Sequence, residues 1–181
     1  WVSGLNGVNY GIGMALLPNS STSTWYQHQY FNALVNSGNI TARAMQSVSS
    51  KSVLGTSAID TGYEDYFFGE VMEVIVISLP QNATVLSATE INQINTHLAI
   101  KYGISLDVSQ TKYLLSDALN IYDSSLAGYE DYNNFIFGIA RDDKSGLYQK
   151  QSTNTDNPVA TVYLDELKET NAENLGVLED K

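Results

Sequence analysis

The stretch FFGEVMEVIVISLPQNATVLSATEINQINTHLAIKYGISLD, residues 67–107, decides the fold. Its first part, residues 67–79, is the clearest strand signal in the chain, because residues 71–77 hold a dense block of Val and Ile. Side chains branched at Cβ fit the pleated, half-buried surface of a sheet. We therefore expect a central β-strand at this place.

The residues that follow predict the helix of the chain. Ser87 and Glu90 have the spacing of a capping box, in which each side chain satisfies the backbone N–H of the other residue. Apolar residues then recur with a helical period until Gly103, which supplies a left-handed stop. The sequence therefore predicts a helix over residues 88–102. Its apolar stripe is narrow, so we expect it on the surface of a sheet, with its polar side and His97 facing solvent.

On both sides of this stretch the sequence alternates short strand signals with turn residues. Residues 1–80 show the rhythm of an antiparallel sandwich, and strand signals resume after the helix. We therefore expect two units, a β-sandwich over residues 1–104 and a second β-rich unit over residues 105–181. The Glu- and Asn-rich segment 168–181 is predicted to be either a loosely held terminus or a strand severed from its partner.

Composition indicates a folded, acidic protein without cysteine. The 181 residues are 43% hydrophobic and 16% charged, and the formal net charge is -11 with only 9 Lys and Arg. A negative field repels other polyanions, which argues against nucleic acid and anionic membranes as partners. The absence of cysteine excludes disulfides and thiolate metal sites. No apolar run is long enough to span a bilayer, so membrane insertion is not expected.

Residues 67–107 resemble the closing segment of concanavalin A-like, laminin-G-like sandwich domains from large bacterial surface or secreted proteins of the Bacteroidetes type. The matching positions are Phe68, Gly69, Glu73 to Val76 and Leu98 to Ile104. Residues 113–152 resemble an uncharacterised β-rich domain that often follows such sandwiches. The resemblance implies a mainly β fold: a concanavalin A-like jelly-roll sandwich with one short surface helix, followed by a second, smaller β-rich unit.

We also expect the chain to be part of a larger exported polypeptide. It begins without Met or a signal-peptide pattern, and residues 1–66 supply fewer strands than a whole sandwich of this kind. The resemblance then implies an extracellular or cell-surface structural or adhesion module, which binds a glycan or a neighbouring cell-surface protein. One alternative is a subunit of a filament, phage or cell-surface assembly that pairs through strand edges. A second alternative is a glucanase-like enzyme that hydrolyses polysaccharide.

No catalytic residues are predicted. A glycoside hydrolase needs two carboxylates on the same side of a cleft. Glu70 and Glu73 are an odd number of residues apart, so on a regular strand they point to opposite faces. His28 and His97 are the only histidines, and neither lies in a nucleophile motif.

Aromatic residues suggest where a ligand binds. The stretch Trp25-Tyr26-Gln27-His28-Gln29-Tyr30-Phe31 could line a sugar-stacking surface, since aromatic faces pair with apolar sugar faces; packing of a strand into the core is the alternative. The pentapeptide GYEDY occurs twice, at residues 62–66 and 128–132. The predicted ligand-binding residues are Trp25, Tyr26, His28, Tyr30, Tyr63 and Tyr66.

Calcium is the cofactor that the acidic loops favour, although none of them has EF-hand spacing. The alternative is that these loops are acidic turns that lead into strands, and that residues 141–146 form a turn in which Arg and Asp pair locally. The predicted metal ligands are Glu64, Asp65, Glu130, Asp131, Asp142 and Asp143.

Overall fold

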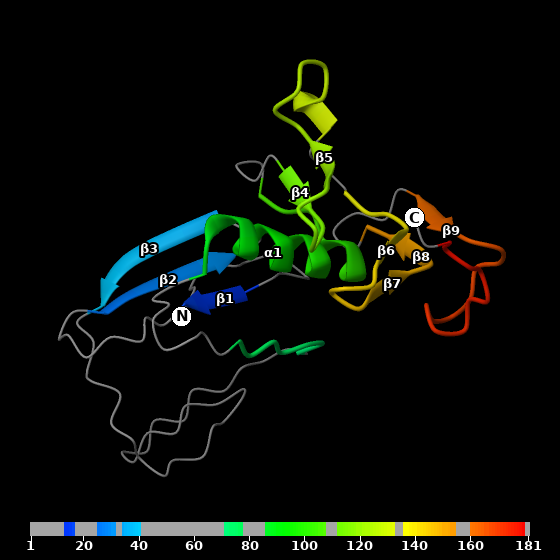
Figure 1. Cartoon of the computed structure of the whole chain (residues 1–181), viewed down its shortest axis with the longest axis horizontal. Coiled ribbons are helices and arrows are strands. Elements are labelled where there is room, and N and C mark those ends of the chain that lie inside the picture. The colour runs from blue at the N-terminus through cyan, green and yellow to red at the C-terminus, as the bar shows by residue number, and fades with distance from the viewer. Residues whose placement is uncertain are drawn as a thin grey trace, which may run out of the picture.

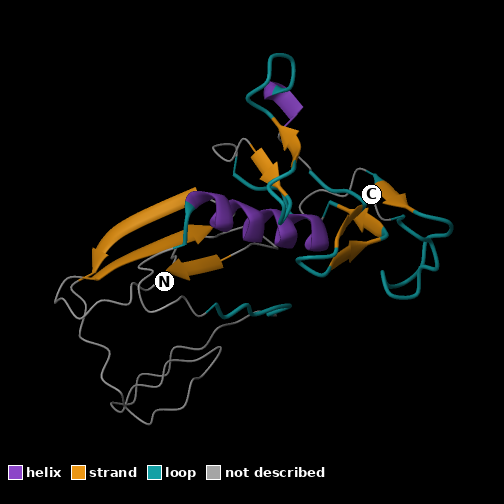
Figure 2. Cartoon of the chain, in the orientation of Figure 1, coloured by secondary structure: helices purple, strands orange, loops and turns teal. Residues whose placement is uncertain are grey.

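The described residues form a β-rich structure with one α-helix (Figures 1 and 2). This computed structural model describes the backbone of residues 13–16, 25–31 and 34–40, and it describes in full residues 71–77, 86–107, 112–132, 136–154 and 160–179. The strands lie in small antiparallel sheets. Within the described residues the predicted β-rich class is confirmed, but neither a sandwich nor a jelly roll is present. No helix in this part of the chain is long and apolar enough to cross a membrane.

The amino-terminal sheet has three strands, β1 (Gly13–Leu16), β2 (Trp25–Phe31) and β3 (Leu34–Ile40). They pair antiparallel in the order β1-β2-β3. The aromatic stretch that the sequence singled out is therefore the central strand of this sheet.

Helix α1 spans Ala88–Tyr102, as the sequence predicts. The Ser87 hydroxyl accepts a hydrogen bond from the Glu90 N–H at 3.2 Å, and the Glu90 carboxylate accepts one from the Ser87 N–H at 2.7 Å. Gly103 ends the helix with φ +64°, and its N–H donates to the Ala99 carbonyl. The residues that predicted the two ends of the helix therefore also form the hydrogen bonds that cap it.

The polar side of α1 is buried, which corrects the expectation that it faces solvent. Asn92, Asn95 and Thr96 are all nearly inaccessible. The reason is that strand β4 (Lys112–Leu114) lies against this side and presents unpaired backbone groups to it. Side-chain amides and hydroxyls can bind such groups, whereas an apolar stripe cannot.

The strands after α1 form three two-stranded antiparallel sheets. Hairpin loops join β4 to β5 and β6 to β7, and β8 pairs with β9. The bounds of the remaining elements are Asn120–Asp123 for β5, Glu130–Tyr132 for the 3-10 helix η1, Ala140–Asp142 for β6, Leu147–Gln149 for β7, Gln151–Thr153 for β8 and Thr161–Tyr163 for β9.

The apolar core of the described residues is small. Its cluster consists of Ala99, Ile104, Leu106 and Tyr113. Tyr113 is fully buried, and its hydroxyl accepts a hydrogen bond from the Leu106 N–H at 3.0 Å. Burial raises the pKa of Tyr113 to about 12. The core thus joins the end of α1, the segment after it and β4.

Residues 71–77 are not the paired central strand that the sequence predicts. They pair with no strand in the described part of the chain, and Val76 is 89% exposed. The carboxylate of Glu73 accepts hydrogen bonds from the Lys101 ammonium at 2.9 Å and the Tyr102 hydroxyl at 2.7 Å. These polar contacts, rather than backbone pairing, hold the segment against α1.

The carboxyl-terminal segment, residues 160–179, is held firmly, so the prediction of a loose terminus is wrong. Asn174 is fully buried, and its amide donates to the carbonyls of Leu164 and Glu166 at 2.8 and 2.9 Å. The Leu178 N–H donates to the Tyr148 hydroxyl at 3.0 Å. Polar side chains bind the backbone of this segment although it has few regular strand partners.

The contact of Gly103 with β8 generates a test. A Cβ at Gly103 would lie 1.9 Å from the Thr153 carbonyl oxygen, whereas a Cβ at Gly146, with φ +72°, would meet nothing within 4 Å. Both positions penalise alanine for the left-handed backbone, by about 1–2 kcal/mol, but Gly103→Ala must also displace β8. We expect Gly146→Ala to lower the free energy of urea unfolding by about 1 kcal/mol and Gly103→Ala by about 3 kcal/mol. Equal losses would contradict the close packing of α1 on β8.

Candidate functional site

Residues 120–132 form an arm that projects from the rest of the described chain (Figure 1, top). We call it the tyrosine arm. It begins with strand β5, continues through a turn and ends in the 3-10 helix η1. Loops that project from a rigid scaffold are where binding residues concentrate in proteins.

The base of the tyrosine arm is organised by Asp123. Its carboxylate accepts hydrogen bonds from the Ser125 N–H at 3.0 Å and the Asn120 amide at 3.1 Å, and it lies 3.5 Å from the Lys112 ammonium. The bond from the Ser125 side chain is the main cause of a lowered pKa at Asp123. This aspartate turn starts the loop in one defined direction.

The tip of the tyrosine arm is closed by its own hydrogen bonds. The Tyr129 N–H donates to the Leu126 carbonyl at 3.0 Å, and the Gly128 N–H donates to the Glu130 carboxylate at 2.7 Å. Gly128 has φ +90°, a conformation that favours glycine. The acidic turn expected here is present and ends in η1, but residues 136–139, the next that the structure describes, are not the strand into which it was expected to lead.

A row of three tyrosine rings connects this tip to the core. Tyr113 and Tyr122 meet edge to face with their ring centroids 5.9 Å apart, and Tyr122 and Tyr129 do so at 6.4 Å. The Tyr122 hydroxyl also donates to the Tyr129 carbonyl at 3.2 Å. Aromatic pairs in this geometry are stabilising beyond their buried area. The tip is thus positioned by a buried residue and is ordered before any ligand arrives.

The outer surface of the tip combines apolar and acidic groups. Leu126, Tyr129 and Tyr132 are 55%, 51% and 67% exposed. The carboxylates of Glu130 and Asp131 lie between the two tyrosines in the sequence and are also exposed. Exposed aromatic rings on an ordered loop offer contact area at little entropic cost. Chemically, the tip can stack on an apolar or cationic group and accept hydrogen bonds.

The predicted ligand residues on β2 can be placed only by backbone. Tyr26, His28 and Tyr30 alternate along the strand and therefore share one face of the sheet, while Trp25 belongs to the other. Tyr63 and Tyr66 lie outside the described residues. The sugar-stacking surface on β2 stays a prediction.

The four predicted metal ligands among the described residues lie in two separate elements. Glu130 and Asp131 belong to the tyrosine arm, whereas Asp142 and Asp143 belong to the β6–β7 hairpin, and Glu64 and Asp65 lie outside the described residues. The part of the chain that the structure describes has no group of three or more His, Asp or Glu side chains that could hold a metal ion. Calcium binding stays a prediction.

The carboxylates of the β6–β7 hairpin are occupied by hydrogen bonds within the described structure. Asp143 accepts two hydrogen bonds of 2.8 Å from the Arg141 guanidinium, so the predicted local pairing of Arg and Asp is confirmed. Asp142 accepts hydrogen bonds from the Ser116 N–H at 2.8 Å and from the Ser116 hydroxyl. Burial alone would raise the pKa of Asp142, but the hydrogen bonds from Ser116 and Ser145 outweigh it and lower the pKa.

The Glu73 carboxylate is also held by hydrogen bonds, and it does not fit the role of a general acid. Its hydrogen bonds with Lys101 and then Tyr102 lower its pKa, whereas a general acid needs a raised one. Burial and the bond to Glu73 raise the pKa of the Tyr102 phenol to about 12. The three side chains form a link between residues 71–77 and α1.

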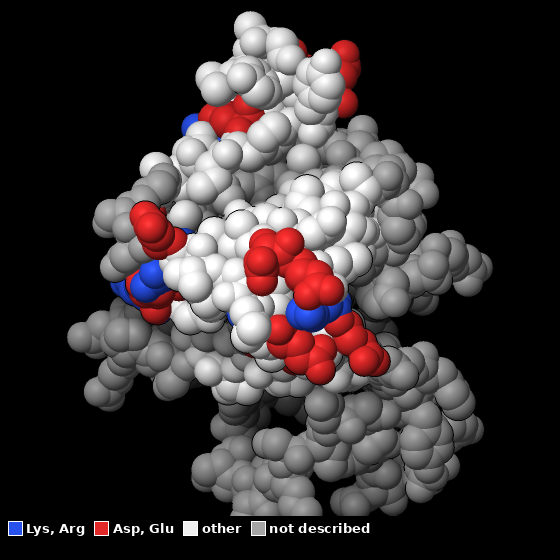
Figure 3. Space-filling model, turned by 90° about the vertical axis from the view of Figure 1, so that its right-hand side faces the viewer, with Lys and Arg blue, Asp and Glu red and all other residues white. Residues whose placement is uncertain are grey.

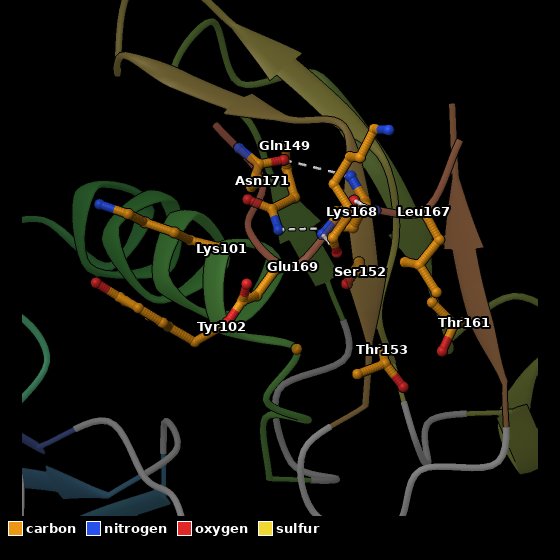
Figure 4. Close-up of a pocket in the computed structure, with 12 residues that line it drawn as sticks. Lys101, Tyr102, Gln149, Ser152, Thr153, Thr161, Leu167, Lys168, Glu169 and Asn171 are labelled. Carbon is orange, nitrogen blue, oxygen red and sulfur yellow. Dashed lines mark hydrogen bonds between the residues drawn. The ribbon is translucent and has the colours of Figure 1, made fainter. Parts of the chain in front are cut away.

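A recess of about 430 Å³ lies between the end of α1 and strands β8 and β9 (Figure 4). Many of its polar groups already serve the fold. Lys101 and Tyr102 bind Glu73, and the side-chain Oδ1 of Asn171 accepts a hydrogen bond from the Lys150 N–H at 2.6 Å. The Ser152 hydroxyl has no partner among the described residues, but its oxygen is enclosed and a molecule in the recess would not reach it. The tyrosine arm is therefore the stronger site.

Residues 90–181 match the model of a family described as Domain of unknown function (DUF8202). The match covers just over half of the chain. The chain therefore belongs to the DUF8202 family. No curated protein and no solved structure matches it. The DUF8202 region begins in the first turn of α1 and contains both the helix side chains that bind β4 and the whole tyrosine arm.

The DUF8202 region also holds a contact that the sequence did not indicate. His97 is half-buried rather than exposed, and its Nδ1 lies 3.2 Å from the Ser145 Oγ on the β6–β7 loop. The two residues are 48 positions apart, so no local sequence pattern could predict this contact. Burial and then the Lys101 charge lower the pKa of His97, while Glu73 and Asp142 act in the opposite direction.

The lowered pKa of His97 predicts a pH dependence. The unfolded chain takes up a proton near the ordinary value of 6.5, before the folded chain does. The contribution of neutral His97 to stability should therefore be fully present above pH 6.5. It should be lost as pH falls from 6.5 towards the lower pKa of the folded chain. Urea unfolding at about pH 7.5 and 5.5 should show a smaller loss for His97→Gln than for the unaltered chain. The same loss in both proteins would contradict the burial of a neutral His97.

Proposed function

We propose that this chain is a non-enzymatic structural or adhesion module of a larger exported surface protein, and that the tyrosine arm makes its contact with a glycan or a neighbouring protein. The observation that carries the proposal is the tip, where Tyr129 and Tyr132 are exposed although the loop beneath them is closed by its own hydrogen bonds. Such a tip loses little freedom on binding, which favours recognition.

The extracellular setting is supported by composition and by the family resemblance of the sequence. The polar, acidic composition of the chain is compatible with a module displayed outside the cell, and acidic side chains predominate over Lys and Arg on the face seen in Figure 3. In this proposal residues 1–104 belong to a concanavalin A-like sandwich. The β1–β3 sheet and the extended, Val- and Ile-rich residues 71–77 would be parts of it.

A second candidate function is assembly through strand edges, as in a filament subunit. The observation that favours it is the segment 71–77, which is extended and exposed and carries the strongest strand-forming residues of the chain. An exposed apolar segment without a paired neighbour can accept a strand from another copy. Size-exclusion chromatography with light scattering would support this function by a concentration-dependent mass. A monomer at every concentration would remove it.

The arm is tested with the labelled chain on two arrays, one of glycans and one of short peptides of varied charge. We expect at least one class to bind, and we expect Tyr129→Ala/Tyr132→Ala to weaken binding by about tenfold, the effect of losing two aromatic contacts. The control is Tyr163→Ala, which removes a tyrosine that is 48% exposed on β9. Binding that is absent from both arrays, or unchanged in the arm variant, would contradict the proposal.

A further inference from the structure

We infer that the ligand of the tyrosine arm is a basic segment of a partner protein, one that presents Arg or Lys side chains. The inference rests on the proposed function, because it names the ligand class of the same site. It is carried by three features of the arm: its charge, the exposure of its rings, and the order of its tip.

The charge of the arm has one sign. Residues 120–132 contain Asp123, Glu130 and Asp131 and no Lys or Arg. The whole chain, these three residues included, has a formal net charge of -11. A field of this sign draws cations towards the surface and repels anionic glycans and phosphates.

The rings at the tip are suited to cations. An ammonium or guanidinium within about 6 Å of a tyrosine ring is attracted by the ring face. The protein already makes such contacts within itself, since the Arg141 guanidinium and the Lys150 ammonium each lie 5.6 Å from the Tyr148 ring. Tyr129 and Tyr132 are exposed, and the described residues place no cation over either ring.

The groups beside the rings complete the chemistry for a long basic side chain. A guanidinium on a ring face could also donate to the carboxylate of Glu130 or Asp131, which are exposed at the same tip. Leu126, which is 55% exposed, offers an apolar surface for the methylene stem of Lys or Arg. A neutral sugar could stack on the same tyrosines but would gain nothing from the charge.

Because the tip is held by its own contacts, we expect the basic segment to bind at the tip and not elsewhere on the acidic surface. Glu130 is fixed by the bond from the Gly128 N–H, and Tyr129 is fixed by the row of rings that begins at Tyr113. Binding should therefore depend on the tip and not on net charge alone.

The test uses calorimetric titration of the full chain with an octapeptide of alternating Arg and Gly. A Glu and Gly octapeptide and a neutral maltohexaose serve as the other ligands. We expect only the Arg peptide to bind, with an affinity that falls about tenfold between roughly 20 and 300 mM NaCl because salt screens the charges. Tyr129→Ala/Tyr132→Ala, which leaves the net charge unaltered, should weaken binding by about tenfold.

Matched charge variants separate the tip from the general field. Glu130→Gln/Asp131→Asn should weaken binding of the Arg peptide by about tenfold. Glu169→Gln/Glu179→Gln removes two exposed carboxylates elsewhere and should weaken binding by less than about twofold. Equal losses in the two charge variants would overturn the inference. Binding of maltohexaose alone at the tip would also overturn it, yet leave the proposed function standing. If none of the three ligands binds, the inference is overturned, while the array experiment still decides the proposed function.

Discussion

The described structure depends on the hydrogen bonds by which α1 binds the edge of β4. The Thr96 hydroxyl and the side-chain Oδ1 of Asn92 accept from the Leu114 N–H at 2.9 and 3.2 Å, and the Asn92 side-chain amide donates to the Lys112 carbonyl at 2.9 Å. Gln93 adds a bond to the Leu115 carbonyl at 2.9 Å. A strand of three residues has too few ladder bonds to be stable alone, so these side chains serve as its second neighbour.

The tyrosine arm follows from this contact step by step. Once β4 is fixed, Tyr113 is buried in the core and β5 pairs along the other edge, with Tyr113 opposite Tyr122. Tyr122 then positions Tyr129 through its ring and its hydroxyl. The same device recurs at the carboxyl-terminal end, where the buried amide of Asn174 binds backbone carbonyls that lack a regular partner. Amide side chains thus bring together segments that a small apolar core could not position by itself.

Local chemistry explains which features could be predicted from sequence. The helix could be predicted to the residue because its start and stop signals, Ser87 with Glu90 and Gly103, act within a few positions. The burial of Asn92 and Thr96 could not be predicted, because it depends on β4, which comes later in the chain. Without that strand, polar residues on a helix predict a solvent-exposed face. The paired strand expected at residues 71–77 failed for a related reason, since strand propensity says nothing of whether a neighbour is present. Of the site, the turn at residues 128–132 was predictable, but the projection of its tyrosines depends on the row of rings.

The central claim, that side chains of α1 hold β4, is tested most directly by Thr96→Val beside Thr89→Val in urea unfolding. The two changes are chemically identical and lie on one helix, but Thr96 is buried against β4 and Thr89 is exposed. The account predicts that Thr96→Val lowers the free energy of unfolding by about 1–3 kcal/mol, since the Leu114 N–H loses its shorter bond inside the protein. Thr89→Val should change it by less than about 0.5 kcal/mol. A Thr96→Val protein as stable as the Thr89→Val protein would contradict the account.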